Sequence, residues 1–114
     1  MDDFFVFEID RNVVGCAGLR MYESPDGPLA ELECLFVAEA YENQGIGAKL
    51  MLYIENRARE RGARRLMALS TQAFNYFQHM GGFKEGDPGL LPTERRKVYD
   101  QSGRHSKVLY KDLG

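Results

Sequence analysis

The part of the sequence that most constrains the fold is the transition from an apolar strand to a long helix between residues 30 and 62. The apolar run at residues 32–37 predicts a buried strand, and the polar turn after it ends in Gly45-Ile46-Gly47. Four apolar residues then recur at four-residue spacing, which predicts a helix with one buried face: Ile46, Leu50, Ile54 and Ala58. Glycines let the backbone approach a ligand, and the helix start offers free N–H groups that suit an anion such as phosphate. A tight turn that binds no ligand is the alternative.

The segments on either side of this transition predict a mixed sheet. Residues 4–9 and 13–22 have the composition of two strands joined by a turn, so with residues 32–37 they predict an antiparallel meander. The apolar run at residues 66–69 predicts a strand parallel to residues 32–37, because the helix between them makes a right-handed crossover. The remaining elements are a helix at residues 72–80, a segment of uncertain state at 94–99, and a strand at 106–111 with Val108 and Tyr110 facing opposite to Leu109. We expect an α+β fold with two main helices in a single domain, residues 1–114.

Composition and charge narrow the classes of function. The chain has 114 residues, 44% apolar and 28% charged, and no apolar run approaches the roughly 20 residues of a membrane span. Its start, Met1-Asp2-Asp3, lacks the basic residues of a secretory signal, so we expect a cytoplasmic protein without membrane contact. Residues 1–33 hold eight acidic and two basic residues, and the remainder of the chain is net basic, which suits a small anionic ligand. No basic stripe is interleaved with aromatic residues, so nucleic acid is not an expected partner.

The cysteines and histidines give no signature of a metal site or a disulfide. Cys16 and Cys34 lie in apolar strand patterns, without a Cys-x-x-Cys motif or a nearby histidine. We therefore expect both to be reduced residues of the core, and no bound metal. His79 and His105 are isolated in the sequence, which favours a surface or structural role over a catalytic one.

The glycine turn after a central strand, the mixed sheet and the pair Gly82-Phe83 resemble the GCN5-related N-acetyltransferase (GNAT) family. The turn of that family usually reads Arg or Gln, two residues, Gly, any residue, then Gly or Ala; here the six positions are E-N-Q-G-I-G, residues 42–47. Within the family, the acetyltransferase domain of N-acetylglutamate synthases is the closer likeness. It is carried by residues 31–35, 69–71, 91–92, 95–99 and above all 103–109, and it extends over about residues 4–113.

The resemblance implies acetyl-CoA as co-substrate and a role for each matching residue. The pyrophosphate of acetyl-CoA would lie at the glycine turn, and its pantetheine arm would pair with the strand like an additional strand. The implied cofactor-binding residues are Leu35, Phe36, Val37, Glu42, Asn43, Gln44, Gly45, Ile46, Gly47 and Ala48. Glu31 would be the base, acting through a water, and Ser70 the proton donor. Cys34, Arg104 and Ser106 would bind the acceptor substrate, with Arg104 gripping a carboxylate because a guanidinium binds carboxylates bidentately.

Several of these roles have structural alternatives. Glu31 could be a solvated carboxylate at a strand edge, and Ser70 could cap the following helix. For Arg95 and Arg96 a solvated helix or loop face is favoured over substrate contact.

The sequence also departs from the family pattern. Glu42 stands where Arg or Gln is usual, and Phe77 stands where many members have a tyrosine acid. The chain begins almost at the hairpin, whereas the family domain begins with a further strand and two helices. Residues 4–9 would then form a bare apolar edge, so we expect a homodimer or a partner chain that covers it.

Together these features predict an N-acetyltransferase that moves an acetyl group from acetyl-CoA to the α-amine of an amino acid. The expected acceptor is L-glutamate, as in arginine biosynthesis. The alternatives are a non-catalytic acyl-CoA-binding or regulatory module, half of a split enzyme, or an acetyltransferase that acts on another amine or a protein N-terminus.

Overall fold

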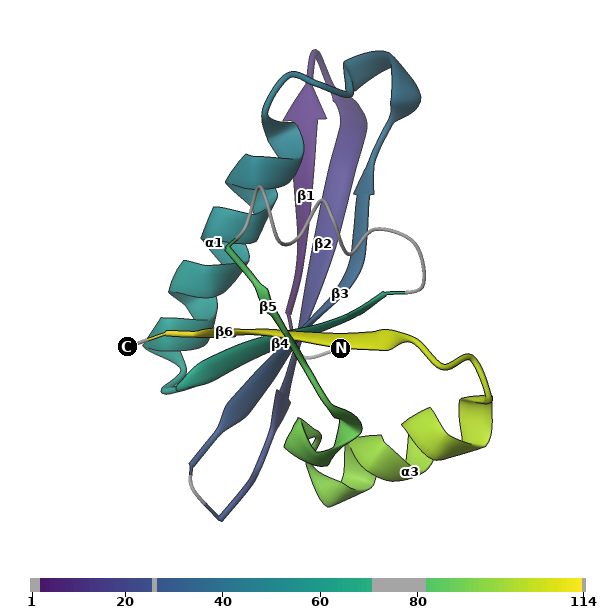
Figure 1. Ribbon diagram of the computed structural model, residues 1–114. Coiled ribbons are helices and arrows are strands. Elements are labelled where there is room, and N and C mark those ends of the chain that lie inside the picture. Colours follow the sequence, from purple (N-terminus) through teal and green to yellow (C-terminus); the bar gives the residue numbers. More distant parts are fainter. Residues whose placement is uncertain (1–2, 26, 71–81, 114) are drawn as a thin grey trace.

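The computed structural model describes residues 3–25, 27–70 and 82–113, which form one six-stranded sheet with helices on both faces (Figure 1). The first half of the chain contains the strands β1 (Asp3–Ile9), β2 (Asn12–Tyr22) and β3 (Leu29–Val37), the 3₁₀ helix η1 (Glu39–Tyr41) and the helix α1 (Ile46–Glu60). The second half contains β4 (Arg65–Ser70), β5 (Lys84–Gly86), the 3₁₀ helix η2 (Pro88–Leu90), the helix α3 (Thr93–Ser102) and β6 (Lys107–Asp112). None of the helices in these ranges is long and apolar enough to cross a membrane.

The sheet has the strand order β1-β2-β3-β4-β6-β5. β1, β2 and β3 form the predicted antiparallel meander, and β4 runs parallel to β3 after the crossover through α1. β6 enters between β4 and β5 and is antiparallel to both. The predicted α+β fold, with a mostly antiparallel sheet and one parallel pair, is therefore confirmed.

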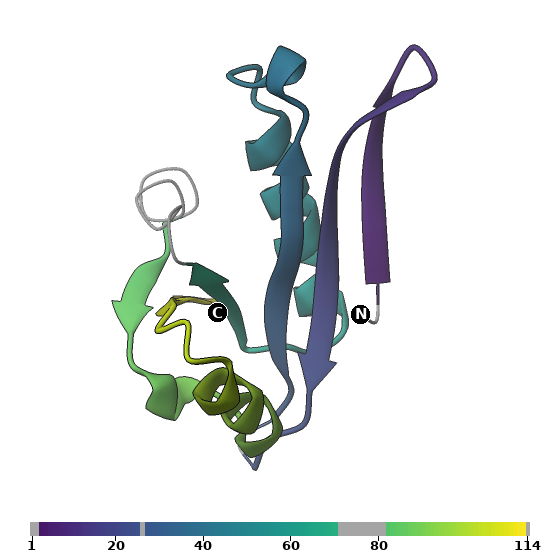
Figure 2. The same cartoon turned by 90° about the vertical axis from the view of Figure 1, so that its right-hand side faces the viewer.

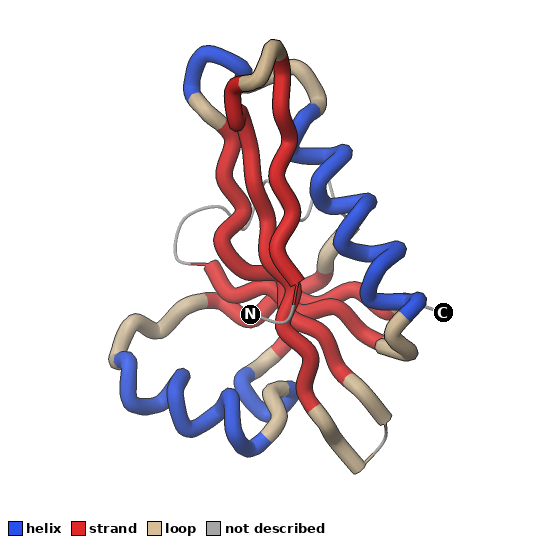
Figure 3. The backbone as a smooth tube through the Cα atoms, turned by 180° about the vertical axis from the view of Figure 1, so that it is seen from behind, coloured by secondary structure: helices blue, strands red, loops and turns tan. Residues whose placement is uncertain are grey.

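α1 covers one face of the sheet with the apolar stripe that its sequence predicts. The four residues of the stripe are at most 4% exposed: Ile46, Leu50, Ile54 and Ala58. They pack against buried sheet residues, among them Val14, Ala17, Leu19, Ala30, Leu32, Leu66 and Ala68. A smaller cluster forms around Tyr22, Met67 and Val108, and Tyr99 of α3 packs against it. α1 and α3 thus lie on opposite sides of the strands (Figure 3).

The segment of uncertain state at residues 94–99 is helical. It belongs to α3, which begins after Pro92 and ends at Gly103, where a φ of 65° terminates the helix. No residue of α3 is buried. The helix therefore lacks the continuous apolar stripe by which α1 could be predicted.

The last strand departs from the predicted alternation. Val108 and Leu109 are neighbours in β6 and so point to opposite faces, yet they are only 1% and 0% exposed. Leu109 packs in the core under α1, and Val108 packs in the cluster under α3. A strand that is covered on both faces has no polar side, so alternation cannot reveal it. The helix predicted at residues 72–80, with Phe77, lies outside the described residues.

β1 is an edge strand of the described sheet. It pairs with β2, and its inward side chains include Phe5, whose ring centroid lies 4.7 Å from that of Tyr53 on α1. Phe4 and Val6 point to the other face and are 52% and 50% exposed. The homodimer or partner chain expected at this edge stays a prediction.

We predict that Leu50→Ala lowers the free energy of unfolding by about 2–5 kcal/mol, because it leaves a cavity between α1 and the sheet. Leu52→Ala is the matched control, since it makes the same change in the same helix at a side chain that is 55% exposed rather than 4%. Its expected effect is about 0.5 kcal/mol or less. Urea unfolding measures both variants, and equal losses would contradict the buried face assigned to α1.

Candidate active site

β3 and β4 separate after only two residue pairs. Their parallel ladder consists of Ala30 with Leu66 and Glu31 with Met67. Beyond Glu31, β3 continues beside β2 while β4 continues beside β6, and Figure 2 shows the two strands diverging. We call this V-shaped opening between β3 and β4 the fork. Glu31 lies at its closed end.

A β-bulge in β3 lies just beyond the closed end of the fork. The register between β2 and β3 shifts there, so that Ala17 of β2 lies opposite two residues of β3, Cys34 and Leu35. Cys34 has a φ of 55°, in the left-handed region that residues other than glycine rarely adopt. A bulge bends its strand and increases the local twist. The bulge therefore turns β3 away from β4.

The fork contains a cleft of about 680 Å³. β3 lines one wall of the cleft, and Ala68, Leu69 and Ser70 of β4 line the other. The loop that follows η1 and the first turn of α1 form one end of it. A ligand in this cleft would contact two strands and the start of a helix at the same time.

The start of α1 is suited to an anion. Gly45 precedes the helix with a φ of 79°, and a Cβ atom placed there would meet nothing within 4 Å. The first turn of α1 contains no acidic residue, so the positive end of its dipole is not neutralised within the helix. The first N–H groups of a helix lack partners inside it and can donate to a phosphate. Glu42 also lines this end of the cleft and is exposed to solvent.

The β3 edge inside the fork offers backbone hydrogen-bonding groups. Residues 32–37 lie beside β2 on one side, and among the described residues they have no strand partner on the fork side. An extended ligand chain can add to such an edge as a strand does. Leu35 and Val37 line the cleft, whereas Phe36 points to the opposite face and is 56% exposed.

Eight of the ten residues predicted to bind the co-substrate line this cleft: Leu35, Val37, Glu42, Asn43, Gly45, Ile46, Gly47 and Ala48. The other two, Phe36 and Gln44, do not. Cys34 lines the cleft and is exposed, so its predicted place in the core is wrong, because the bulge removes it from the regular alternation of β3. Cys16 is half-buried, and both thiols are free.

Ser70 and Ser106 lie at the same end of the sheet. Ser70 is the last residue of β4 and pairs with Lys107, the first residue of β6. Ser106 therefore comes directly before the residue that faces Ser70. The hydroxyl of Tyr99 donates to the backbone oxygen of Ser106 at 2.8 Å, which ties this segment to α3. The helix that Ser70 could cap lies outside the described residues.

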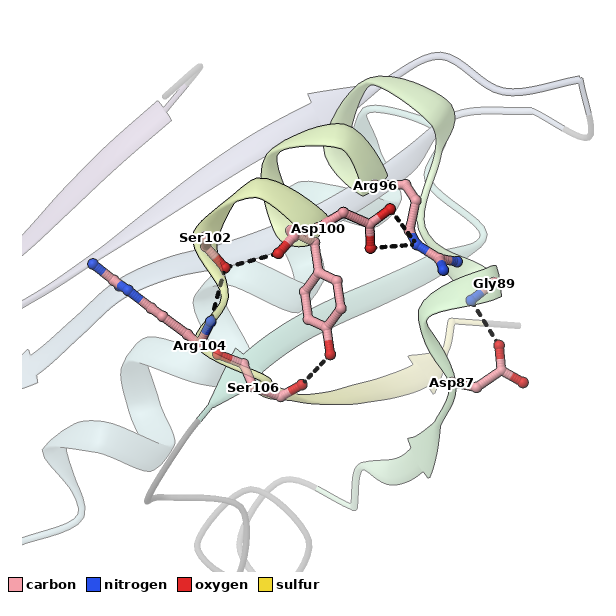
Figure 4. A network of polar contacts seen from close by, with 8 residues as sticks. Asp87, Gly89, Arg96, Asp100, Ser102, Arg104 and Ser106 are labelled. Carbon is pink, nitrogen blue, oxygen red and sulfur yellow. Dashed lines mark hydrogen bonds and ion pairs between the residues drawn. The ribbon is translucent and has the colours of Figure 1, made fainter.

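Arg104 lies in the turn between α3 and β6. Two of its neighbours are left-handed, Gly103 with a φ of 65° and His105 with a φ of 54°. The backbone N–H of Arg104 donates to Ser102 Oγ at 3.3 Å. Its side chain is exposed, and Figure 4 shows the guanidinium extended away from Asp100 and Arg96. The structure thus holds the backbone of Arg104 while its charge stays at the surface.

Glu31 is only 3% exposed, and its side chain lies on the face of the sheet that α3 covers. The hydroxyl of Tyr22 donates to Glu31 Oε1 at 3.1 Å, and Arg95 Nε donates to the same oxygen at 2.8 Å. The reading of Glu31 as a solvated carboxylate is therefore wrong. The solvated face proposed for Arg95 is also wrong, since its side chain is 18% exposed and paired with Glu31. Arg96 does lie at the surface, in an ion pair with Asp100.

No local sequence pattern indicates that Tyr22 and Arg95 are partners of Glu31. Arg95 is 64 residues away from Glu31 in the chain and reaches it from a different element. One weak signal was the pair Arg95-Arg96, because neighbours on a helix point about 100° apart and only one of them can face the sheet. Burial and the Glu31 carboxylate raise the pKa of Tyr22 well above the usual value near 10.

A second hollow, of about 1180 Å³, lies among the loops before β3, after α1 and before α3. Its walls include Tyr22, Arg59, Arg64, Leu91 and Leu113. None of the residues predicted to bind or to react with substrate lines it. The candidate active site is therefore the fork.

Residues 2–82, more than half of the chain, match the acetyltransferase (GNAT) family. The chain belongs to this family. The amino-acid acetyltransferase of Neisseria meningitidis serogroup A is 35% identical over 113 residues, which cover 99% of this chain and 25% of that protein. The amino-acid acetyltransferase of Serratia proteamaculans is 33% identical over the same shares of the two chains.

A solved structure shows the same arrangement of elements. The N-acetylglutamate synthase of Neisseria gonorrhoeae, complexed with coenzyme A and N-acetyl-glutamate, aligns with a TM-score of 0.91 and 36% identity. The alignment covers 97% of this chain and 26% of that chain. This GNAT chain thus spans about a quarter of the length of the relatives it matches.

We predict that the free energy of unfolding falls more steeply above about pH 10 in the wild type than in Tyr22→Phe. An unfolded tyrosine loses its proton near pH 10, whereas the raised pKa keeps Tyr22 protonated in the folded state. The folded state then binds one proton more than the unfolded state, so stability falls with rising pH by up to about 1.4 kcal/mol per unit.

Urea unfolding at several pH values between about 9 and 11.5 spans the range in which the two states differ in bound protons. Tyr53→Phe is the matched control, because it removes a hydroxyl from a side chain that is 58% exposed. Equal slopes for the wild type and Tyr22→Phe would show that Tyr22 is not held protonated by its surroundings.

Proposed function

We propose that this chain transfers an acetyl group from acetyl-CoA to the α-amine of an amino acid, with L-glutamate as acceptor. The observation that carries the proposal is the fork, which combines an anion-suited helix start, an unpaired strand edge and a buried carboxylate at its closed end. Membership of the GNAT family and the likeness to amino-acid acetyltransferases support the class of reaction. The relative complexed with coenzyme A and N-acetyl-glutamate supports both substrates, and with them a place in arginine biosynthesis.

The residues of the fork fit acetyl-CoA along the length of the cleft. The open space at Gly45 and the N–H groups of the first turn of α1 suit the pyrophosphate. The free edge of residues 32–37 suits the amides of the pantetheine arm, which can form hydrogen bonds as a strand does. Such a placement directs the thioester toward the closed end of the fork. Acetyl-CoA supplies the activated acetyl group, and the chain supplies the orientation.

The proposed chemistry is a direct transfer. The amine nitrogen attacks the carbonyl carbon of the thioester, a C–N bond forms, and the C–S bond breaks. The amine loses a proton, which we assign to Glu31 through a water. The departing thiolate gains a proton through the hydroxyl of Ser70, which regains one from solvent, and Glu31 returns its proton to solvent. A thiolate with a pKa near the reference value of about 8.5 is a good leaving group, so a hydroxyl that only relays a proton from solvent is sufficient.

The acceptor is held by the turn before β6. Arg104 projects an unshielded guanidinium from a turn whose backbone is fixed by Ser102, and Ser106 is fixed by Tyr99. A guanidinium binds a carboxylate through two parallel hydrogen bonds, which sets the orientation of an amino acid as well as its affinity. We assign the substrate carboxylate to Arg104 and Ser106, which lie outside the cleft lining, and a further contact with the acceptor to Cys34, which lines the cleft.

A non-catalytic acyl-CoA-binding module is the second candidate. The observation that favours it is that the chain spans about a quarter of its relatives, so other parts of those proteins could complete the acceptor site. The exposed residues Phe4 and Val6 of β1 fit the same idea, since a homodimer or a partner chain would cover them. In a third arrangement the chain is half of a split enzyme, and a second chain supplies the rest of the acceptor site.

We predict that the purified chain releases free thiol from acetyl-CoA in a manner that depends on glutamate. Arg104→Ala is expected to lower kcat/KM for glutamate by about 100-fold, because a charge-assisted bidentate contact contributes about 2–3 kcal/mol. Arg96→Ala is the matched control, since it removes a neighbouring surface arginine that pairs with Asp100. Thiol-detection kinetics with a panel of amino acids measures these values. If no acceptor causes thiol release but acetyl-CoA still raises Tm, the acetyltransferase proposal is wrong and the chain is a non-catalytic acyl-CoA-binding module.

We predict that Gly45→Ala weakens acetyl-CoA binding by roughly fivefold. A methyl group beside the helix start would prevent the closest approach of the phosphate and cost about 1 kcal/mol of binding free energy. Gly103→Ala is the matched control, since Gly103 also has a positive φ and open space around its Cα. Both variants are expected to lose about 1 kcal/mol of stability from backbone strain. Calorimetric titration with acetyl-CoA distinguishes them, and equal affinities for the two variants would place the pyrophosphate elsewhere.

A further inference from the structure

The hydrogen bonds of Glu31 are distributed unequally between its two carboxylate oxygens. Oε1 accepts both from the hydroxyl of Tyr22 at 3.1 Å and from Arg95 Nε at 2.8 Å. No group among the residues that the structure describes donates a hydrogen bond to Oε2. Oε2 is also not one of the fully buried side-chain atoms that lack a hydrogen-bond partner. Within the described residues, one oxygen of this buried carboxylate therefore has two donors and the other has none.

The two donors come from different elements. Tyr22 is the last residue of β2, next to β3, and Arg95 lies on α3, which packs across the face that carries Glu31. A glutamate side chain has three rotatable bonds, and two donors from separate directions restrict all three. Glu31 therefore has one orientation that is set by the fold and not by its own rotamer preferences.

The position of this carboxylate coincides with the closed end of the fork. Glu31 and Met67 form the last pair of the β3–β4 ladder, and the next residues, Leu32 and Ala68, already line the cleft. The side chain of Glu31 does not line the cleft itself; it points to the other face of the sheet, toward Tyr22 and Arg95. A substrate amine that approaches the closed end from the α3 face would meet this carboxylate, while the thioester would arrive from the cleft on the α1 side.

The mode of contact with Arg95 also matters. An arginine that used both of its terminal nitrogens would occupy both carboxylate oxygens of Glu31. Contact through Nε to Oε1 compensates the charge of the buried carboxylate and leaves Oε2 unoccupied. Tyr22 adds a second hydrogen bond on the same oxygen, so it reinforces the asymmetry.

We propose that Tyr22 and Arg95 are positioning residues that present Glu31 Oε2 to the reacting amine through a water. The inference rests on the proposed function and assigns two further residues to it. In the reaction the amine proton passes through the water to Oε2, while the nitrogen forms its bond to the acetyl carbon and sulfur leaves with the C–S electron pair. Tyr22 and Arg95 keep their own protons throughout and touch neither substrate.

A double-mutant cycle on kcat tests this inference. Glu31→Gln is expected to lower kcat by about 100-fold or more, as for loss of a general base. Tyr22→Phe and Arg95→Met are each expected to lower kcat by about tenfold through misplacement of the carboxylate, with KM for glutamate changed less than about twofold. Arg95→Lys, which keeps a charged donor, is expected to restore part of the loss. Arg96→Met, one residue along α3, is the matched control and leaves kcat unchanged.

The decisive measurement is the same pair of substitutions in the Glu31→Gln background. Residues that act only through Glu31 cause no further loss of kcat there, whereas residues with a separate structural role reduce kcat by the same factor in both backgrounds. If Arg95→Met alone fails to fold, the test uses Tyr22→Phe and the double variant Arg95→Met/Glu31→Gln. The double variant leaves no buried carboxylate without its partner.

The outcomes separate this inference from the proposed function. Glutamate-dependent thiol release by the wild type with additive losses, or with a raised KM and an unchanged kcat, overturns the positioning role alone. No thiol release by the wild type with any acceptor overturns the proposed function and this inference together. Loss of kcat that disappears in the Glu31→Gln background supports both.

Discussion

The bulge at Cys34 is the constraint on which the rest of the site depends. A regular β3 would continue its ladder with β4 beyond Glu31, and the hydrogen bonds of that ladder would close the fork. The extra residue also changes the face of the side chains that follow. Glu33 and Phe36 point to the same face although they are three positions apart, and Leu35 and Val37 are left to line the cleft. The free strand edge, the cleft and its lining all follow from one additional residue.

Sequence patterns predicted the elements that have a single buried face, such as α1, or a short continuous apolar run, such as β4. α1 has four apolar residues at four-residue spacing, and the structure buries all of them. α3 buries none of its residues, so no apolar period in its sequence indicates a helix. β6 buries Val108 and Leu109 on opposite faces, so it shows no alternation. β5 has only three residues, too few for any period to appear.

The same distinction applies to the candidate site. The glycine turn could be found from the sequence, because Gly45 directly precedes α1, Gly47 lies in its first turn, and the geometry is local. The surroundings of Glu31 could not be found in this way. Its partners belong to β2 and α3, 9 and 64 residues away, and their meeting depends on the packing of α3 across the sheet. Arg95 and Arg96 are equivalent in sequence terms, and only the orientation of α3 decides that one is paired with a buried carboxylate and the other with Asp100 at the surface.

The choice of residue at the start of α1 has a consequence for the helix itself. Most helices begin with Ser, Thr, Asp or Asn, whose side chain accepts hydrogen bonds from the first N–H groups, but α1 begins after Gly45 and has no such side chain. A phosphate at this position would accept the same hydrogen bonds and would act as the missing cap. The same hydrogen bonds would then stabilise both the first turn of α1 and the bound ligand. The stability of this turn would therefore rise with ligand concentration by mass action. The longest described helix of the protein would then take its cap from a ligand and not from its own side chains.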